Sequence, residues 1–391
     1  MSAPLVLHVQ KVAGISGSEA HLLALLPRLH EAGWNIRFLM LHEHEPGAWE
    51  FARELEASGI PLDAIPIAAD VDPFAFLRVL GYLLRKRPTI LHTHLVHADA
   101  YGQIAGIASR VPLRLSTKHG FNEFREGRLF AFGDRLVASL ADRQVSISRG
   151  LARYLVATEG FRIEDFEIVH YGLGPRLEPE PDPDADGAMR FLCIGRLIPI
   201  KGHLVLLRAF ARALAELPGL RLDIAGRGPL APGLKALARE LGIAGSVRFL
   251  GQVVPPQRAI EDVSVVVVPS LGEGFGMVAL EAMERGRPVI ATRIGGLEDI
   301  VRDGETGILV PLTDVDALTT AILRLARDPD LAARMGRAGR ARMIERFPEH
   351  RCTERTDLLY RSLLSRREIL DGMPAIAAPA SSASTKSHGI R

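Results

Sequence analysis

The sequence has few cysteines, no long apolar run and no strong net charge. Only Cys193 and Cys352 are present, which excludes a disulfide scaffold and a zinc site built from cysteines, and favours a reducing compartment. No stretch approaches the ~18 uninterrupted apolar residues of a membrane-spanning helix, and the N-terminus lacks the basic segment of an export signal. The net charge of +2 indicates no nucleic-acid partner. We expect a cytoplasmic protein, with peripheral membrane contact left open.

The length and composition indicate a globular protein of more than one domain. Apolar residues make up 47% of the 391 residues and charged residues 24%, as in ordinary globular proteins. At ~150 residues per domain, a chain of this length forms two or three domains, and we take two as the starting number.

Short apolar runs alternate with helical stretches along the chain. Because these runs are continuously apolar, they predict parallel strands that are covered on both faces. In the first half they span residues 4–12, 35–41, 89–95, 113–120, 143–148 and 166–172, and in the second half 190–197, 220–226, 247–251, 263–270, 287–292 and 307–311. Residues 18–33 predict a helix that ends at Gly33 and is kinked at Pro27.

This order of elements predicts two doubly wound, Rossmann-like α/β domains that face a central ligand cleft. The expected divisions are an N-terminal domain (1–173), a linker rich in proline and acid (174–189), a C-terminal domain (190–345), C-terminal helices that pack back toward the N-terminal domain (346–373) and a disordered tail (374–391).

Ligands of such domains bind beyond the carboxyl ends of the strands, so we examined the residues that follow each run. Arg196 and Lys201, in "GRLIPIKG", combine a planar guanidinium with a movable ammonium and suit a diphosphate. The alternative is a pair of solvated surface cations. The "AGRGP" turn (225–229) suits a phosphate or an ordinary tight turn equally well.

The stretch "EGFGMVALE" holds two carboxylates, Glu273 in a loop and Glu281 in the helix that follows. We expect this helix to begin near Phe275 or Gly276, where its free amides can bind an anion. The alternative is that Glu273 compensates the helix dipole and Glu281 faces solvent. The apolar neighbours of Glu281 argue against simple exposure.

These motifs resemble those of the retaining family-4 glycosyltransferases with the GT-B fold. The strongest matches are the Glu-x7-Glu element "EGFGMVALE", "GRLIPIKG", "AGRGP" and the continuation at 281–311. Weaker matches in the first half are "SGSEAHLLALLPRLHEAGW", "LHTHLVHA", "STKHG" and "VSISRGLARYL", so the resemblance covers nearly all of residues 4–365.

The resemblance implies a role for each matching position. Arg196 and Lys201 would bind the donor diphosphate, Glu281 the ribose, and Glu273 the donor sugar together with the amides of Gly274, Phe275 and Gly276. Gly17 would allow close approach to the donor phosphate, His119 would lie beside the transferred sugar, and Val253 in "GQVV" would contact the base. His119 and Glu273 would be the catalytic pair.

Two positions depart from the family pattern. Ser16 stands where the family usually has the first of two glycines, which leaves Gly17 alone to permit the close approach. Tyr171 stands in place of the usual Asn before Gly, so no role is carried to it.

Other motifs carry weaker hypotheses. Asp-x-Asp patterns at 70–72, 182–186 and 314–316 could indicate a metal-dependent transferase of another fold, but none follows a convincing core strand. His92, His94 and His97 could bind a metal, although a cleft-lining or structural role is favoured because no carboxylate or cysteine partner is evident. "GGLEDI" (295–300) predicts a turn and a helix start.

The stretch from Arg110 to Arg135 mixes basic and aromatic side chains with few acids. It suits either an anionic lipid-linked acceptor or membrane surface, or an ordinary solvated surface over a core helix. Its members are Arg114, Lys118, Phe121, Phe124, Arg125, Arg128, Phe130 and Phe132.

Together these features predict a retaining glycosyltransferase that needs no metal or other cofactor. It would move a hexosyl or N-acetylhexosaminyl group from a UDP- or GDP-sugar to a glycan or lipid-linked acceptor, in cell-surface polysaccharide or glycolipid biosynthesis. A nucleotide-sugar epimerase of the same fold and a non-catalytic nucleotide-sugar or glycan binding protein remain as alternatives.

Overall fold

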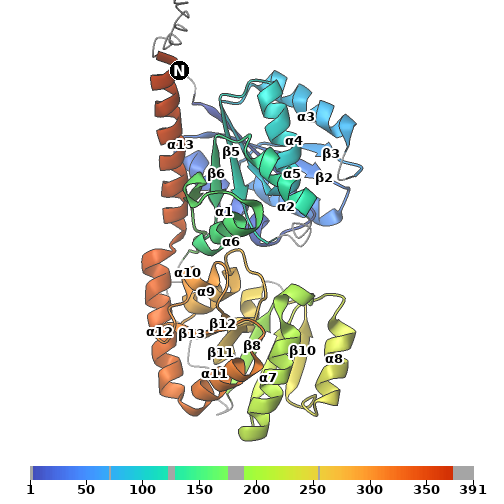
Figure 1. The fold of residues 1–391 in the computed structure, drawn as a ribbon, viewed down its shortest axis with the longest axis vertical. Helices are drawn as coiled ribbons and strands as arrows, with labels where there is room; N and C mark the ends of the chain where they lie inside the picture. Colours follow the sequence, from blue (N-terminus) through green and yellow to red (C-terminus); the bar gives the residue numbers. More distant parts are fainter. Residues whose placement is uncertain (1–2, 70–71, 122–127, 175–188, 254–255, 373–391) are drawn as a thin grey trace, which may run out of the picture.

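The computed structural model describes residues 3–69, 72–121, 128–174, 189–253 and 256–372. Within them the chain forms two parallel sheets flanked by helices, one above the other in Figure 1. The expected two-domain, doubly wound α/β architecture is confirmed. The tail at 374–391 and most of the linker at 174–189 lie outside the described residues.

The first sheet has seven parallel strands in the order β3-β2-β1-β4-β5-β6-β7, so the strand order reverses between β1 and β4. Its strands are β1 (Leu5–Lys11), β2 (Asn35–His42), β3 (Leu62–Pro66), β4 (Ile90–His94), β5 (Leu113–Lys118), β6 (Arg143–Ser146) and β7 (Phe166–Ile168). The sequence pattern missed β3, a short edge strand with proline at its end, where a missing amide costs little.

Helices cover both faces of this sheet. On one face lie α1 (Gly17–Glu31), α2 (Pro46–Ala57) and the C-terminal helix α13 (Glu349–Gly372), and on the other α3 (Pro73–Lys86), α4 (Leu95–Ala108) and α5 (Arg128–Ala138). Helix α6 (Arg149–Glu159) faces the second domain. Pro27 lies inside α1, which ends at Glu31, and Gly33 follows with a φ of 96°.

The second sheet has six parallel strands in the order β10-β9-β8-β11-β12-β13, with the reversal between β8 and β11. Its strands are β8 (Arg190–Ile194), β9 (Arg221–Ala225), β10 (Val247–Gly251), β11 (Val265–Val268), β12 (Val289–Thr292) and β13 (Gly307–Val310). Its helices are α7 (His203–Glu216), α8 (Ala231–Glu240), α9 (Met277–Glu284), α10 (Leu297–Ile300), α11 (Val315–Arg327) and α12 (Pro329–Arg346).

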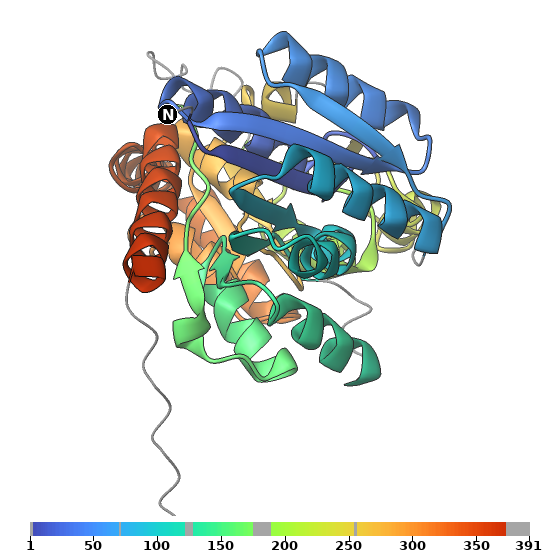
Figure 2. The same ribbon diagram turned by 90° about the horizontal axis from the view of Figure 1, so that it is seen from above.

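Helix α13 returns from the second domain to the first. It lies alongside the N-terminal sheet in both views (Figures 1 and 2). Tyr360 is fully buried between α13 and the sheet, and Asp357 accepts a hydrogen bond from the indole of Trp34 at 2.7 Å. The first domain therefore completes its core with α13, which follows the whole second domain in the sequence.

A buried ion pair lies next to the carboxyl end of β5. The Lys118 ammonium is 2.6 Å from a carboxylate oxygen of Asp99 and 3.4 Å from one of Asp134, and the Lys118 and Asp99 side chains are fully buried. Asp99 also accepts hydrogen bonds from Thr93 and Ser116. This network fixes the residue immediately before His119.

We predict that Asp99→Ala lowers the free energy of unfolding by about 3–5 kcal/mol, because it leaves the Lys118 charge buried without its nearest partner. Urea unfolding of the purified protein measures this loss. The matched control is Glu216→Ala, which removes the partner of Arg327 at 2.8 Å in a pair more than half exposed. The control should cost less than about 1 kcal/mol, and equal losses in both variants would contradict the prediction.

Candidate functional site

The carboxyl ends of the two sheets meet where the chain makes its closest contacts between domains. A Cβ at Gly274, in the loop after β11, would lie 2.4 Å from the carbonyl oxygen of His119, which follows β5. The Ser148 hydroxyl donates to the Gly274 carbonyl at 2.6 Å. Only glycine permits so close an approach. The structure thereby brings His119 and the loop of Glu273 together, although they belong to different domains.

Lys201 and Glu273 also meet, from two loops of the second domain. The Lys201 ammonium lies 2.7 Å from a Glu273 carboxylate oxygen, and the Ser270 hydroxyl is 3.2 Å from the same oxygen. Gly202 makes this possible, because it adopts a φ of 70° and a Cβ there would lie 1.9 Å from the carbonyl oxygen of Pro269. Arg196, in the same loop as Lys201, is exposed, and its side chain has no partner within the described part of the chain.

The glycines of the "AGRGP" turn serve packing. A Cβ at Gly226 would lie 1.9 Å from the Gly195 carbonyl oxygen, and one at Gly228 would lie 2.4 Å from that of Leu197. The turn therefore supports the Arg196 loop from behind. This contact favours the tight-turn interpretation of the sequence over direct phosphate binding.

Helix α9 begins at Met277, after Gly276 with a φ of 106°. No described residue accepts a hydrogen bond from the amides of Gly274, Phe275 or Gly276, so these donors are available at the helix N-terminus. The Phe275 ring is buried and packs against Tyr171. Glu281 is 7% exposed, which rules out the solvated position considered above.

The remaining predicted donor-site positions are Gly17 and Val253. Gly17 is the first residue of α1, and a Cβ there would meet no described atom within 4 Å, so no protein contact requires glycine. Ser16, the departure from the family pattern, is the N-cap of α1 and pairs with Glu19 in a capping box. Val253 is half-buried and is the last residue described before a gap.

A continuous hydrogen-bonded chain of rings extends from the half-buried His119 into the core of the first domain. His119 bonds the Tyr171 hydroxyl through Nδ1 and His94 through Nε2, and His94 continues to His8 at 2.9 Å. Tyr360 follows, 3.3 Å from His8 and 2.6 Å from His92. The motif "HTHLVH" thus supplies two members, and the others come from distant parts of the sequence.

The surroundings of these histidines favour the neutral form of each ring. Burial and the neighbouring histidines lower the pKa of His8, His94 and His119 well below 6.5, and burial lowers that of His92 to about 3. A neutral imidazole donates one hydrogen bond and accepts one, so the chain can be ordered in a single direction.

The hypothesis of a metal site in "HTHLVH" can be examined in the cluster that His92 and His94 form with His8. Nitrogen atoms of His8, His92 and His94 lie within 4.8 Å of one another, which is close enough for a metal site. Each of their ring nitrogens already has a hydrogen-bond partner in this network, including Thr117 for Nε2 of His92. The network therefore favours the cleft-lining and structural interpretation.

Sequence reasoning missed Tyr171 and His21. Tyr171 received no role, yet its hydroxyl bonds His119 and its ring stacks on His21 with centroids 3.9 Å apart. Its position soon after β7 is the signal that would have found it, because the same rule identified the other loops. His21 lies inside a helix pattern and gave no local signal.

Residues behind several of the weaker sequence hypotheses have structural roles in the fold. Asp72 and Asp314 cap α3 and α11, which explains two of the Asp-x-Asp patterns; residues 70–71 and 182–186 lie outside the described residues. "GGLEDI" forms the predicted turn and the short helix α10. In the basic and aromatic stretch, Arg114 pairs with Asp142 and Lys118 is buried in an ion pair with Asp99. These two cations are therefore engaged within the protein and do not form part of a basic surface. Phe124 and Arg125 lie outside the described residues.

Comparison with known proteins supports the same interpretation. Residues 16–172 match the family described as glycosyl transferase 4-like domain, and residues 188–328 match glycosyl transferases group 1. A GDP-mannose-dependent alpha-(1-6)-phosphatidylinositol monomannoside mannosyltransferase of Mycolicibacterium smegmatis is 40% identical over 179 residues, covering 41% of this chain and 47% of that protein. A D-inositol 3-phosphate glycosyltransferase of Acidothermus cellulolyticus is 32% identical over 339 residues, covering 79% and 75%.

The fold also matches solved structures. Anabaena HepE, solved in complex with UDP and glucose, has a TM-score of 0.80 over 92% of this chain and 100% of its own, at 18% identity. The chain spans about half the length of the mannosyltransferase and three quarters of the inositol-phosphate enzyme. With both family matches, the Acidothermus relative and this likeness in fold, the chain belongs to the family-4, group 1 glycosyltransferases and has the GT-B fold.

Proposed function

We propose that the protein is a retaining glycosyltransferase that moves a hexosyl or N-acetylhexosaminyl group from a UDP- or GDP-sugar to a glycan or lipid-linked acceptor. The observation that carries this proposal is that His119 meets the Glu273 loop across the two domains, while Glu273 itself pairs with Lys201. The names of the GDP-mannose-dependent relative and of the neighbour solved with UDP and glucose support a nucleotide-sugar donor.

Each predicted donor residue has a role that its position supports. Lys201 and Arg196 would bind the diphosphate, and a bound diphosphate would compete with Glu273 for the Lys201 ammonium. The free amides of Gly274, Phe275 and Gly276 would hold the phosphate nearest the sugar. Glu281, buried in α9 beyond these amides, would bind the ribose hydroxyls. Gly17 would lie beside the phosphate and Val253 beside the base.

The reaction breaks the bond between the anomeric carbon and the phosphate oxygen. Negative charge develops on the diphosphate, where Lys201, Arg196 and the amides of α9 stabilise it without a metal. The acceptor oxygen bonds to the same face of the anomeric carbon, and its proton passes to the departing phosphate oxygen. The neutral imidazole of His119 would orient the sugar by hydrogen bonds, and so would the carboxylate of Glu273.

The acceptor side has a candidate membrane-binding surface, which we name the α3–α4–α5 surface. These three helices and the residues that follow α3 and α4 carry exposed apolar side chains together with exposed cations. Within the helices the carboxylates are Asp99 and Asp134, which are buried, and a further carboxylate, Asp72, caps the N-terminus of α3. The apolar members are Phe74, Leu77, Leu84, Ile104, Ile107, Phe132 and Leu136, and the cations are Arg78, Arg85, Lys86, Arg87, Arg110 and Arg135.

This surface lies on the side of the first domain away from α13 (Figure 1). Among the described residues, no helix has both the length and the apolar character to cross a bilayer. Apolar side chains beside cations suit docking to an anionic lipid surface. We therefore propose peripheral contact with the inner face of the membrane and a role in cell-surface polysaccharide or glycolipid synthesis.

Replacing either donor residue should weaken nucleotide binding. We expect Lys201→Ala and Glu281→Ala each to raise the Kd for the nucleoside diphosphate about 10- to 100-fold, since each removes a hydrogen bond to a charged group. Isothermal titration calorimetry measures this change, with Glu240→Ala on the exposed side of α8 as the control. Wild-type affinity in both variants would contradict the assignment of Lys201 and Glu281 to the donor site.

His119→Ala should lower kcat about 100-fold while leaving donor affinity within about threefold, because the side chain acts at the reacting sugar. Burial holds the pKa of His119 well below 6.5, so the neutral form persists from pH 6.5 upward and its titration should not change kcat there. Steady-state rates with His350→Gln as an exposed control test this. Interconversion of free nucleotide sugars without any acceptor would instead establish an epimerase, and tight binding of every donor without turnover would establish a binding protein.

Phe74→Ser with Leu77→Ser should reduce binding to phosphatidylcholine vesicles that contain phosphatidylglycerol by at least about tenfold, because both side chains leave water on docking. Vesicle cosedimentation measures it. Leu204→Ser with Ile344→Ser removes two comparably apolar exposed side chains from the second domain and should have no effect. Equal binding by the two double variants would exclude the α3–α4–α5 surface.

A further inference from the structure

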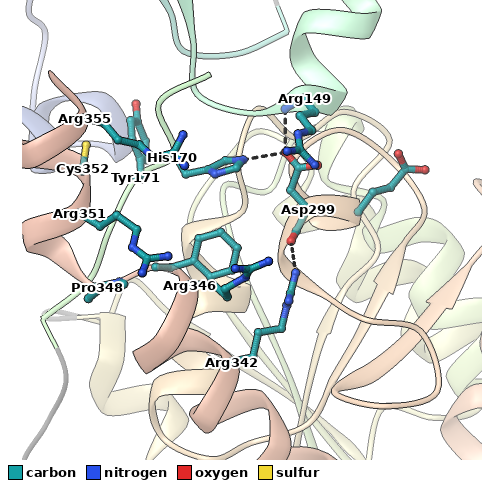
Figure 3. Close-up of a pocket in the computed structure, with 12 residues that line it drawn as sticks. Arg149, His170, Tyr171, Asp299, Arg342, Arg346, Pro348, Arg351, Cys352 and Arg355 are labelled. Atoms are coloured by element: carbon teal, nitrogen blue, oxygen red, sulfur yellow. Dashed lines mark hydrogen bonds and ion pairs between the residues drawn. The ribbon is translucent and has the colours of Figure 1, made fainter. Parts of the chain in front are cut away.

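A cavity of about 250 Å³ lies at the hinge between the domains, lined by residues that none of the roles above uses. Its walls come from both domains: the start of α6, the segment after β7, α10, the end of α12 and the start of α13 (Figure 3). We call it the hinge cavity. Tyr171 separates it from the site, since this residue lines the cavity and also bonds His119.

The hinge cavity is strongly basic. Five arginines line it, Arg149, Arg342, Arg346, Arg351 and Arg355, against the two carboxylates Glu298 and Asp299. The lining therefore holds three more positive than negative formal charges. In Figure 3, Arg346 and Arg351 reach the cavity from α12 and α13, whereas Arg149 and His170 lie on its opposite side.

The two carboxylates are already engaged. Asp299 accepts a hydrogen bond from the Arg149 backbone amide at 2.7 Å and lies 2.9 Å from Nε2 of His170. Glu298 pairs with Arg153, which does not line the cavity. The carboxylates of Glu298 and Asp299 therefore bind other groups and form no ion pair with the guanidinium of Arg149 or of Arg351.

The arginines fall into two groups. Arg342 donates to the carbonyls of Asp299 and Ile300, both at 2.8 Å, and Arg355 donates to that of Ile168, so these two have structural roles.

By contrast, neither Arg149 nor Arg351 has a side-chain acceptor among the residues that the structure describes. The carboxylate that Arg346 meets belongs to its exposed neighbour Glu345, at 3.8 Å. Like charges around one cavity repel each other unless an anion lies between them. Consistent with this, burial and then the charges of Arg302 and Arg346 lower the pKa of Arg342.

We propose that the hinge cavity binds a phosphate monoester, through the guanidinium groups of Arg149, Arg346 and Arg351. Guanidinium forks match the oxygens of a phosphate dianion, and the volume accommodates a phosphate joined to one small polyol or sugar. Because the walls belong to both domains, the bound anion joins α6 to α12 and α13 and stabilises their contact. The same chemistry occurs in a free sugar phosphate and in a monoester lipid headgroup.

The test is calorimetry of the full chain with glucose 6-phosphate. It is carried out in the Lys201→Ala background, so that binding at the proposed donor site does not contribute. We expect Arg149→Gln and Arg351→Gln each to raise the Kd at least about tenfold. Arg239→Gln, an exposed arginine of α8, is the matched control and should leave the Kd unchanged.

A second arm distinguishes the source of the phosphate. Vesicles that carry phosphatidic acid are cosedimented with the same variants in the Phe74→Ser, Leu77→Ser background, so that docking through the α3–α4–α5 surface does not mask the result. A loss of binding in Arg149→Gln and Arg351→Gln but not in Arg239→Gln identifies a lipid headgroup. Loss only with glucose 6-phosphate identifies a free metabolite. Because the two arginines have no described side-chain partner, the thermal unfolding midpoint without ligand should match that of the wild type.

Two results would overturn the phosphate site in the hinge cavity. If neither probe binds, or if binding is unaffected in both Arg149→Gln and Arg351→Gln, the hinge cavity is no phosphate site. Glucose 6-phosphate that binds wild type but not Lys201→Ala occupies the donor site, which rejects the hinge site while leaving the proposed function intact.

Discussion

The close approach of backbone to backbone between the two domains is the constraint on which the site depends. A Cβ at Gly150 would lie 2.1 Å from the carbonyl oxygen of Gly295, and Gly274 meets His119 in the same way. Any side chain at these positions would push the sheets apart, since peptide groups cannot yield as a flexible side chain can. His119 would then move away from the Glu273 loop, and the walls of the hinge cavity would separate. The active-site geometry and the basic cavity thus share one origin.

Adjacent residues at the end of β5 show two ways of burying a polar group. Lys118 lies in an ion pair with Asp99 and Asp134, whereas His119 joins a chain of hydrogen-bonded rings where burial lowers its pKa. Both arrangements give the buried group hydrogen-bond partners that hold its side chain in one orientation. In the proposed function, this rigidity helps to place the sugar accurately.

Much of the fold could be predicted from the sequence because it follows from local pattern. Continuous apolar runs located the strands other than β3. The rule that ligands meet strand ends located the loops of Arg196, Lys201 and Glu273, and the family resemblance located His119. The ring network could not be predicted, because His8 and His94 are 86 residues apart and His92 and Tyr360 are 268 apart. The arginines of the hinge cavity likewise come from separate helices, and on each helix they look like ordinary surface charges.

Helix α13 has a consequence for how the chain matures. The first sheet leaves the ribosome long before Tyr360 and Asp357, yet Tyr360 fills its core and Asp357 holds Trp34. Until α13 is synthesised, His8 and His92 lack the phenol that joins them, and the apolar face beside α1 stays open to water. The N-terminal domain therefore stays incompletely packed until α13 is made, and exposed apolar surface of this kind makes a nascent chain prone to aggregate.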